Sequence, residues 1–299
     1  MIRGQLEQLF GNYRLLCQLG RGGFSQIYLA EHELFHTQAV VKILDGRRTE
    51  NDIAKFLAQA SVLIHLRHPH IVPVLDFGLQ DDTAYLVMDY APHGSLRERH
   101  PKGTSLSPEI VTLYINQVAL ALDYIHQHKL IHRDVKPQNL LLGPNNEVLL
   151  SDFGIAVVSQ SLDPLYAEVY DFEGTVIYAA PEQLQGKPRR SSDQYALGIV
   201  VYEWLCGSWP FSGSFDELVH QHLFVPPVPL RAKNSALSPA IEYVVMKALA
   251  KDPDERFSSV GEFASALSHA VEGSPSVPTQ TKARRQFRSP QPFRDLESL

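Results

Sequence analysis

The sequence predicts an α+β fold with more than one lobe. A strand-like apolar run at 39–44 follows a Gly-rich turn near the start of the chain, whereas 108–126 carries apolar residues at helical spacing. The length of 299 residues exceeds one typical domain but suits two lobes. The apolar share of 44% is enough to build a substantial core.

The first predicted element is a Gly-rich turn between two segments of alternating pattern. Glycine lets backbone amides approach phosphate oxygens closely, since a Cβ atom would hold them away. A plain hairpin can have the same composition, so the turn alone leaves both interpretations open. The turn consists of Leu19, Gly20, Arg21, Gly22, Gly23, Phe24, Ser25, Gln26, Ile27 and Tyr28.

The next predicted strand, 39–44, contains a single Lys, Lys42, in an otherwise apolar run. A Lys in such a run needs an anionic partner, because an unpaired buried charge is costly. The alternative is an edge-strand Lys that discourages aggregation. The short distance from the Gly-rich turn favours a Lys that holds nucleotide phosphates.

The segment 132–139, His-Arg-Asp-Val-Lys-Pro-Gln-Asn, precedes an Asp-Phe-Gly sequence that starts at Asp152. This spacing matches the phosphoryl-transfer site of protein kinases, in which the Asp orients the acceptor hydroxyl and the Asn and the second Asp hold magnesium. Magnesium prefers such oxygen ligands. The apolar runs 140–142 and 148–150 predict two short strands joined by a turn, which would hold both metal ligands on rigid backbone.

Together these motifs resemble a eukaryotic-type protein kinase, and bacterial Ser/Thr kinases most of all. The resemblance covers roughly 13–270. It also implies that Arg256, in the last motif, pairs with Glu182. These later motifs follow in the family's order: Gly174-Thr175, Tyr178-Ala179-Ala180-Pro181-Glu182, Ser192-Asp193-Gln194-Tyr195-Ala196-Leu197-Gly198 and Asp252-Pro253-Asp254-Glu255-Arg256-Phe257.

The resemblance implies a two-lobed protein kinase fold. A small, mainly antiparallel β lobe with one helix, at about 50–66, precedes a larger, mainly α-helical lobe, and an ATP cleft lies between them. In the large lobe a helix is expected over 108–126, with Ser107 as its cap and Pro108 as its first residue. The expected boundaries are 1–12 for an N-terminal extension, 13–271 for the kinase domain (small lobe 13–90, large lobe 91–271) and 272–299 for a tail.

The resemblance also assigns roles to single residues. Asp134 would be catalytic, with Lys136 beside it, and Lys42 would hold the α- and β-phosphates of ATP. Asn139 and Asp152 would bind Mg²⁺, for which Mn²⁺ can substitute. Besides the Gly-rich residues Leu19 to Ile27, the nucleotide pocket would comprise Val40, Lys42, Met88 at the back of the adenine site, the hinge residues Asp89, Tyr90 and Ala91, and Leu141.

Lys136 and Thr175 match the Ser/Thr branch of the family, so we expect protein Ser/Thr hydroxyls as substrates, with autophosphorylation. Arg133, beside the catalytic Asp, is expected to receive a phosphate from the activation segment, because charge-assisted bonds order such loops. The residues that could carry this phosphate are Ser159, Ser161, Tyr166 and Tyr170.

Three positions depart from the family pattern. Ser25 replaces the third glycine of the Gly-rich turn, and Val40 stands where many members have Ala. Counting back from His68-Pro69 places Gln59 where the family has the Glu that pairs with the strand Lys. Without that charge a hydrogen bond to Lys42 is roughly half as strong. The alternative to an active enzyme is therefore a nucleotide-binding pseudokinase that acts as a scaffold.

Composition excludes some other classes. The formal net charge of −6 gives no nucleic-acid footprint. Cys17 and Cys206 are far apart and lack metal-ligand spacing, so a reduced, cytoplasmic setting is expected. The apolar stretch near 197–206 is too short to span a bilayer, and no transmembrane segment is predicted.

The tail is rich in Pro, Ser and Arg and is expected to be flexible. Its basic run 282–288 could touch acidic lipid or a partner weakly, although a solvated linker is favoured. The oligomeric state is not readable from the sequence.

Overall fold

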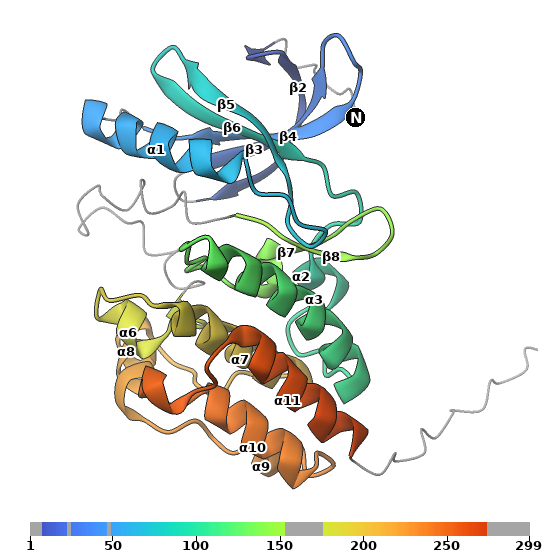
Figure 1. Cartoon of the computed structure of the whole chain (residues 1–299), viewed down its shortest axis with the longest axis vertical. Coiled ribbons are helices and arrows are strands. Elements are labelled where there is room, and N and C mark those ends of the chain that lie inside the picture. The colour runs from blue at the N-terminus through green and yellow to red at the C-terminus, as the bar shows by residue number, and fades with distance from the viewer. Residues whose placement is uncertain (1–7, 23–24, 47–48, 153–175, 274–299) are drawn as a thin grey trace, which may run out of the picture.

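The computed structural model describes residues 8–22, 25–46, 49–152 and 176–273. Figure 1 shows a β-rich lobe, crossed by one long helix, above a larger lobe built from helices. This is the α+β architecture that the sequence predicts. Among the described residues, no helix combines the length and the apolar character needed to cross a membrane.

The small lobe contains a six-stranded antiparallel sheet in the order β1-β2-β3-β4-β6-β5. Its first strand pairs Leu9 with Arg14 and Phe10 with Tyr13. That strand lies within the segment expected above to be an N-terminal extension, and it is not predicted from the sequence. The strands are β1 (Leu9–Phe10), β2 (Tyr13–Gly22), β3 (Ser25–His32), β4 (Gln38–Leu44), β5 (Val74–Gln80) and β6 (Thr83–Asp89).

The alternation of side chains along β4 decides where Lys42 points. Successive residues of a strand face opposite sides of the sheet. Val41 and Ile43 belong to a cluster on the outer face, whereas Val40 and Leu44 pack with the main core. Lys42 shares its face with Val40 and Leu44, so it points toward the helix of the small lobe and the large lobe.

Helix α1 (Glu50–Leu63) covers this inner face of the sheet (Figure 1). It begins with a capping box, in which the Thr49 side chain accepts from the Asp52 backbone and Asp52 accepts from the Thr49 backbone. The helix buries Phe56, Ala60 and Leu63. It ends short of the predicted limit at about 66, because Ile64 forms the C-cap.

The large lobe is mainly helical. Helix α3 covers the predicted 108–126 region, with Ser107 at the N-cap and Pro108 at the first helical position as predicted, although the Ser107 side chain makes no capping hydrogen bond. The predicted strands at 140–142 and 148–150 form an antiparallel hairpin. The elements are α2 (Leu96–Arg99), α3 (Pro108–Gln127), η1 (Pro137–Asn139), β7 (Leu140–Leu142), β8 (Val148–Leu150), α6 (Pro181–Leu184), α7 (Arg190–Cys206), α8 (Phe215–Phe224), α9 (Leu230–Lys233), α10 (Pro239–Ala248), η2 (Pro253–Glu255) and α11 (Val260–Glu272).

Helix α7 is the central helix of this lobe, and nearly all of its side chains are buried. Gly198 lets α7 pass close to the end of α10, because a Cβ atom there would lie 3.0 Å from Leu249 and 3.3 Å from Ala248. One continuous apolar cluster joins α7 to both lobes, since it includes Leu63, Leu86 and Leu150. The two lobes therefore share one continuous apolar core.

Candidate active site

The loop that contains Asp134 is fastened to the start of helix α7. The fully buried carboxylate of Asp193 accepts from the backbone amides of His132 at 2.9 Å and Arg133 at 2.8 Å. His126 of α3 donates to the same carboxylate from Nε2 at 2.7 Å. Three donors satisfy this buried carboxylate, as a charge out of water requires, and they hold the loop in place.

His132 connects the loop to the strand that precedes Asp152. Its Nδ1 accepts from the Asp134 backbone amide at 3.3 Å, so its proton lies on Nε2, which donates to the Ser151 carbonyl at 2.8 Å. The imidazole is fully buried. It thus fixes the spacing between the Asp134 loop and the end of β8.

Asp134 lies between two donors. Lys136 Nζ is 3.0 Å from Asp134 Oδ2, and Asn139 Nδ2 donates to the same oxygen at 2.9 Å and to the Asp134 carbonyl at 2.8 Å. The Asp134 side chain is 25% exposed. Its carboxylate is held in one orientation but remains accessible to solvent.

Asp152 follows β8 and adopts a left-handed backbone with φ of +60°. Its Oδ1 lies 2.6 Å from Nζ of Lys42, which reaches across from the sheet. Burial alone would raise the pKa of the Asp152 carboxyl, but the Lys42 ammonium, assisted by Lys136, holds that pKa below its ordinary value. Asp152 is therefore ionised at neutral pH.

Asn139 and Asp152 fit a magnesium site. The Ser151 amide and hydroxyl both donate to the Asn139 carbonyl, at 2.9 and 3.0 Å, so the two residues are anchored side by side. Because Nδ2 of Asn139 binds Asp134, the amide oxygen is the atom left for a cation. Within the described residues no group of three or more His, Cys, Asp or Glu forms a metal cage. Two oxygen ligands suit Mg²⁺ that is held jointly with phosphates.

Three of the expected nucleotide residues belong to or pack against the apolar core that the two lobes share. Val40 pairs with Met88 across β4 and β6, and Leu141 of β7 packs on the same core. A Cβ atom at Gly20 would meet nothing within 4 Å, which leaves open space over the strand. Gly23 and Phe24, the tip of the turn, lie outside the described residues.

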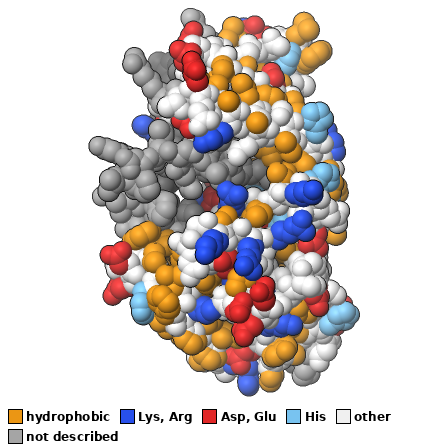
Figure 2. Space-filling view, turned by 60° about the vertical axis from the view of Figure 1, so that its left-hand side comes forward, with side chains coloured by type: hydrophobic (Ala, Val, Ile, Leu, Met, Phe, Trp, Pro, Cys, Tyr) orange, Lys and Arg blue, Asp and Glu red, His pale blue; other side chains and the backbone are white. Residues whose placement is uncertain are grey.

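The hinge residues Asp89, Tyr90 and Ala91 follow β6 directly. The Asp89 amide donates to the Pro73 carbonyl at 3.0 Å and so is not free to bind a nucleotide. On the face drawn in Figure 2, Lys and Arg side chains gather at mid-height, where the lobes meet. That sign of charge attracts an anionic ligand.

Gln59 does not contact Lys42 by a hydrogen bond. Its Oε1 is buried and has no hydrogen-bond partner among the described residues. The weak Lys42 bond expected for this amide is thus not formed in the structure, and Lys42 pairs with Asp152 instead. Arg133, expected to receive the activation-segment phosphate, is described, whereas Thr175 and the residues expected to carry that phosphate lie outside the described part of the chain.

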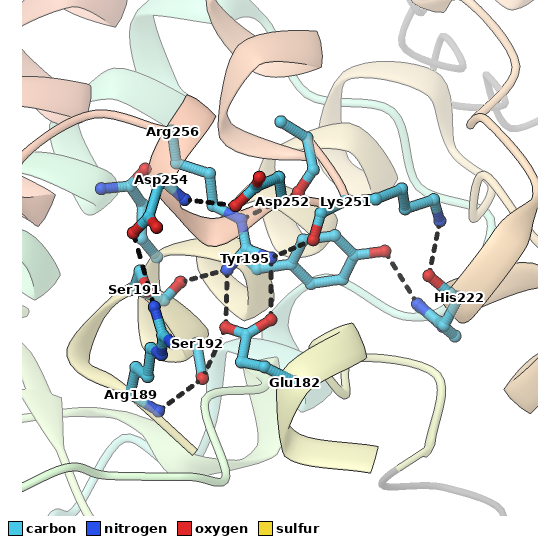
Figure 3. Close-up of polar contacts among 12 residues, drawn as sticks. Glu182, Arg189, Ser191, Ser192, Tyr195, His222, Lys251, Asp252, Asp254 and Arg256 are labelled. Atoms are coloured by element: carbon cyan, nitrogen blue, oxygen red, sulfur yellow. Dashed lines mark hydrogen bonds and ion pairs between the residues drawn. The ribbon is translucent and has the colours of Figure 1, made fainter. Parts of the chain in front are cut away.

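The pairing of Glu182 with Arg256, implied by the resemblance, is present (Figure 3). Arg256 makes a bidentate contact to the Glu182 carboxylate at 2.7 and 2.9 Å, and the Ser192 hydroxyl donates to it at 2.7 Å. Burial would raise the pKa of Glu182, but the hydrogen bonds and charge of Arg256 hold it below the ordinary value. Gln183, the next residue, donates to the Arg133 carbonyl at 2.8 Å and so connects this cluster to the Asp134 loop.

We expect Arg256→Ala to lower the free energy of unfolding by about 3–5 kcal/mol, since it leaves the buried Glu182 carboxylate unpaired. Urea unfolding followed by circular dichroism measures the change. Arg14→Ala is the matched control: the Arg14–Glu33 contact is 2.6 Å but its side chains are 55% and 40% exposed. It should cost at most about 1 kcal/mol. Equal losses in the two variants would contradict a special role for the buried pair.

Two supporting groups were not identified from the sequence. Asp193 belongs to one of the late motifs, and its position at the start of an apolar helix is the signal that could have identified it as a supporting residue. The second group surrounds Tyr178, whose hydroxyl donates to Glu203 at 2.7 Å and accepts from Trp209 at 3.2 Å. Arg97 binds the same Glu203 at 2.7 and 2.9 Å and Tyr178 at 2.7 Å. Nothing local in the sequence links these positions.

Comparison with known proteins agrees with the geometry. A family model described as the protein kinase domain matches residues 13–271. The chain is 38% identical over 276 residues to the serine/threonine-protein kinase PknF of Mycobacterium tuberculosis. The aligned region covers 88% of this chain and 57% of the relative. The chain is 32% identical to PrkC of Bacillus subtilis over 270 residues (89% and 41%) and 35% identical to PknB of Mycolicibacterium smegmatis over 281 residues (91% and 45%).

The chain belongs to the protein kinase family. It spans only about half the length of the curated relatives it matches.

Proposed function

We propose that this chain is an ATP-dependent Ser/Thr protein kinase that transfers the γ-phosphate to protein hydroxyls and to itself. The observation that carries the proposal is the convergence of Lys42, Asp134, Asn139 and Asp152 on one site, with Lys42 at 2.6 Å from Asp152 and Asn139 at 2.9 Å from Asp134. The names of the relatives, all serine/threonine-protein kinases, support the same activity.

In this proposal Asp134 orients the acceptor hydroxyl and accepts its proton, and Lys136 offsets the charge beside it. Lys42 would bind the α- and β-phosphates, and Asn139 and Asp152 would hold Mg²⁺, or Mn²⁺ in its place, whose charge would offset that of the phosphates. Val40, Met88 and Leu141 would contact the nucleotide base. These roles rest on the family resemblance and on the contacts described above.

We also propose 13–271 as the catalytic domain, divided near residue 90, with 1–12 and 272–299 as flanking segments. A cytoplasmic setting accords with Cys17 and Cys206, which are both free thiols. Protein substrates follow from the proposed class of enzyme. The names of the relatives lend no support to the pseudokinase alternative.

Incubation of the purified chain with magnesium and labelled ATP, followed by phosphosite mapping, tests the activity. We expect label on Ser and Thr residues of the chain or of an added protein, and none above background in Asp134→Asn. ATP-dependent thermal stabilisation without any phosphate transfer would contradict the proposal and would leave a nucleotide-binding scaffold.

Substitution of Gln59 tests whether the missing Glu limits the rate. Gln59→Glu supplies a charged partner for Lys42, and a gain on the order of 1 kcal/mol would raise turnover up to about tenfold. Gln59→Ala removes an amide that makes no bond to Lys42, so its turnover should stay within about twofold of wild type. Steady-state rates at saturating ATP compare the three proteins. A large loss in Gln59→Ala would show that this amide does anchor Lys42 during turnover.

A further inference from the structure

We propose that Lys42 is the counter-ion of Asp152 in the nucleotide-free protein. A divalent cation can then bind Asp152 only when the phosphates of a nucleotide attract Lys42 away from this carboxylate. The inference rests on the proposed function for the identity of the nucleotide and the cation. It depends on a feature of this chain, namely that helix α1 offers Lys42 no charged alternative.

The first step is the strength of the Lys42–Asp152 contact. The ammonium and the carboxylate are 2.6 Å apart, and their side chains are only 15% and 26% exposed. Attraction between opposite charges is strong where water is largely excluded. Each group, once partly desolvated, needs an opposite charge. A cation that binds Asp152 must therefore displace Lys42 or share the carboxylate with it.

The second step is the character of the α1 face that lies beside this pair. Leu63 of α1 and Asp152 line the same small cavity, of about 10 Å³, together with Met88. Gln59 precedes Leu63 by four residues and so shares its side of the helix. Gln59 carries no charge, and its buried Oε1 has no partner among the described residues.

The third step is that the described residues offer Lys42 no other acid within reach. Asp52 is buried on α1, but it accepts from the Thr49 amide at 3.2 Å and the Thr49 hydroxyl at 2.7 Å. It lies seven residues before Gln59, about 10 Å along the helix. Within the part of the chain that the structure describes, Asp152 is the one acid within ion-pair distance of Lys42.

The consequence is that cation and nucleotide bind in a coupled way. Phosphates give Lys42 a new anionic partner and thereby free Asp152. By linkage, a nucleotide that strengthens cation binding is itself strengthened by the cation to the same degree. A Glu at position 59 would loosen this coupling, because Lys42 could leave Asp152 without any nucleotide.

The three methionines of the chain, Met1, Met88 and Met246, provide a direct measurement. Met88 lines the cavity that Asp152 also lines, whereas Met246 lies in α10 of the large lobe. Mn²⁺ bound at Asp152 will broaden the NMR signal of a ¹³C-labelled Met88 methyl group, and Met246 serves as the internal reference. Met88→Leu assigns the signal. The titration is performed on the full chain without nucleotide.

In wild type we expect selective broadening of Met88 to require about tenfold or more Mn²⁺ than in Gln59→Glu or Lys42→Met, within the usual range of coupling between sites. Gln59→Leu, uncharged and similar in size, should behave as wild type. Asp152→Asn in the Gln59→Glu background should abolish the broadening, which excludes Mn²⁺ binding to the new Glu itself. The Gln59→Glu result suffices if Lys42→Met does not fold.

Wild-type protein that binds Mn²⁺ at Asp152 as tightly as Gln59→Glu and Lys42→Met would overturn the inference. So would tightening in Gln59→Leu, since that variant adds no charge. This readout is independent of phosphate transfer. If the chain transfers phosphate but the variants do not differ in Mn²⁺ binding, only this inference is contradicted. If the variants show the expected Mn²⁺ pattern but the chain transfers no phosphate, the competition between Lys42 and the cation is supported and the proposed function is contradicted.

Discussion

Asp134→Asn is expected to lower turnover by about a hundredfold or more while the affinity for ATP stays within a few-fold of wild type. The reason is chemical, because an amide has nearly the shape of the carboxylate but cannot accept the hydroxyl proton. The structure adds that Lys136 and Asn139 both point donors at Asp134 Oδ2. The Asn oxygen can still satisfy them, so the loop should keep its conformation.

Single-turnover rates and nucleotide binding by fluorescence titration separate the two effects of this variant. Asp254→Asn is the matched control, since its carboxylate is 85% exposed and distant in sequence from the Asp134 loop. It should leave turnover unchanged. Full autophosphorylation by Asp134→Asn would remove Asp134 from its assigned role.

Asp152→Ala is expected to abolish phosphate transfer and to weaken the thermal stabilisation that ATP gives in the presence of magnesium. A ligand stabilises a protein only through its affinity for the folded state, so the loss of a metal ligand lowers the shift in Tm. In EDTA, where no magnesium is bound, Asp152→Ala should no longer weaken the stabilisation by ATP. With Asp152 gone, Lys42 has no competing carboxylate, and metal-free ATP should stabilise the variant at least as well as wild type.

Differential scanning fluorimetry with ATP, with and without magnesium, provides the comparison. Lys42→Met is the complementary variant, since it should lose transfer and also lose stabilisation by ATP in EDTA. Equal magnesium-dependent stabilisation in wild type and Asp152→Ala would contradict the metal role of Asp152.

Local chemistry explains why much of the fold was predictable. The β7–β8 hairpin follows from two apolar runs around a Gly-Pro-Asn-Asn turn, and helix α3 follows from its apolar spacing and from Pro108. Both are signals contained in about 20 residues or fewer. The pairing of Arg256 with Glu182 came instead from the family resemblance, because no local signal connects residues 74 positions apart.

The features that escaped prediction depend on tertiary contacts. Asp193 holds the Asp134 loop from about 60 residues away, and Lys42 meets Asp152 across 110 residues. Neither spacing carries a periodic or turn signal. The two-residue strand β1 is too short for any alternating pattern, and it forms because β2 offers it an edge. Ser107 occupies the predicted N-cap position of α3, but the residue type alone does not ensure that its side chain makes the capping hydrogen bond.

The attachments of the site divide it between two bodies. Asp134, Asn139 and Asp152 are joined through His132, Ser151 and Asp193 within the large lobe, whereas Lys42 belongs to strand β4 of the small lobe. We call the site assembled when Lys42 is in place beside the large-lobe residues. Substitutions in the large lobe alter the activity of an assembled site, whereas substitutions around α1 alter the fraction of molecules in which the site is assembled. A partner that presses on α1 can raise turnover only until every molecule is assembled. The ceiling of its activation would then report the fraction of molecules that are assembled at rest.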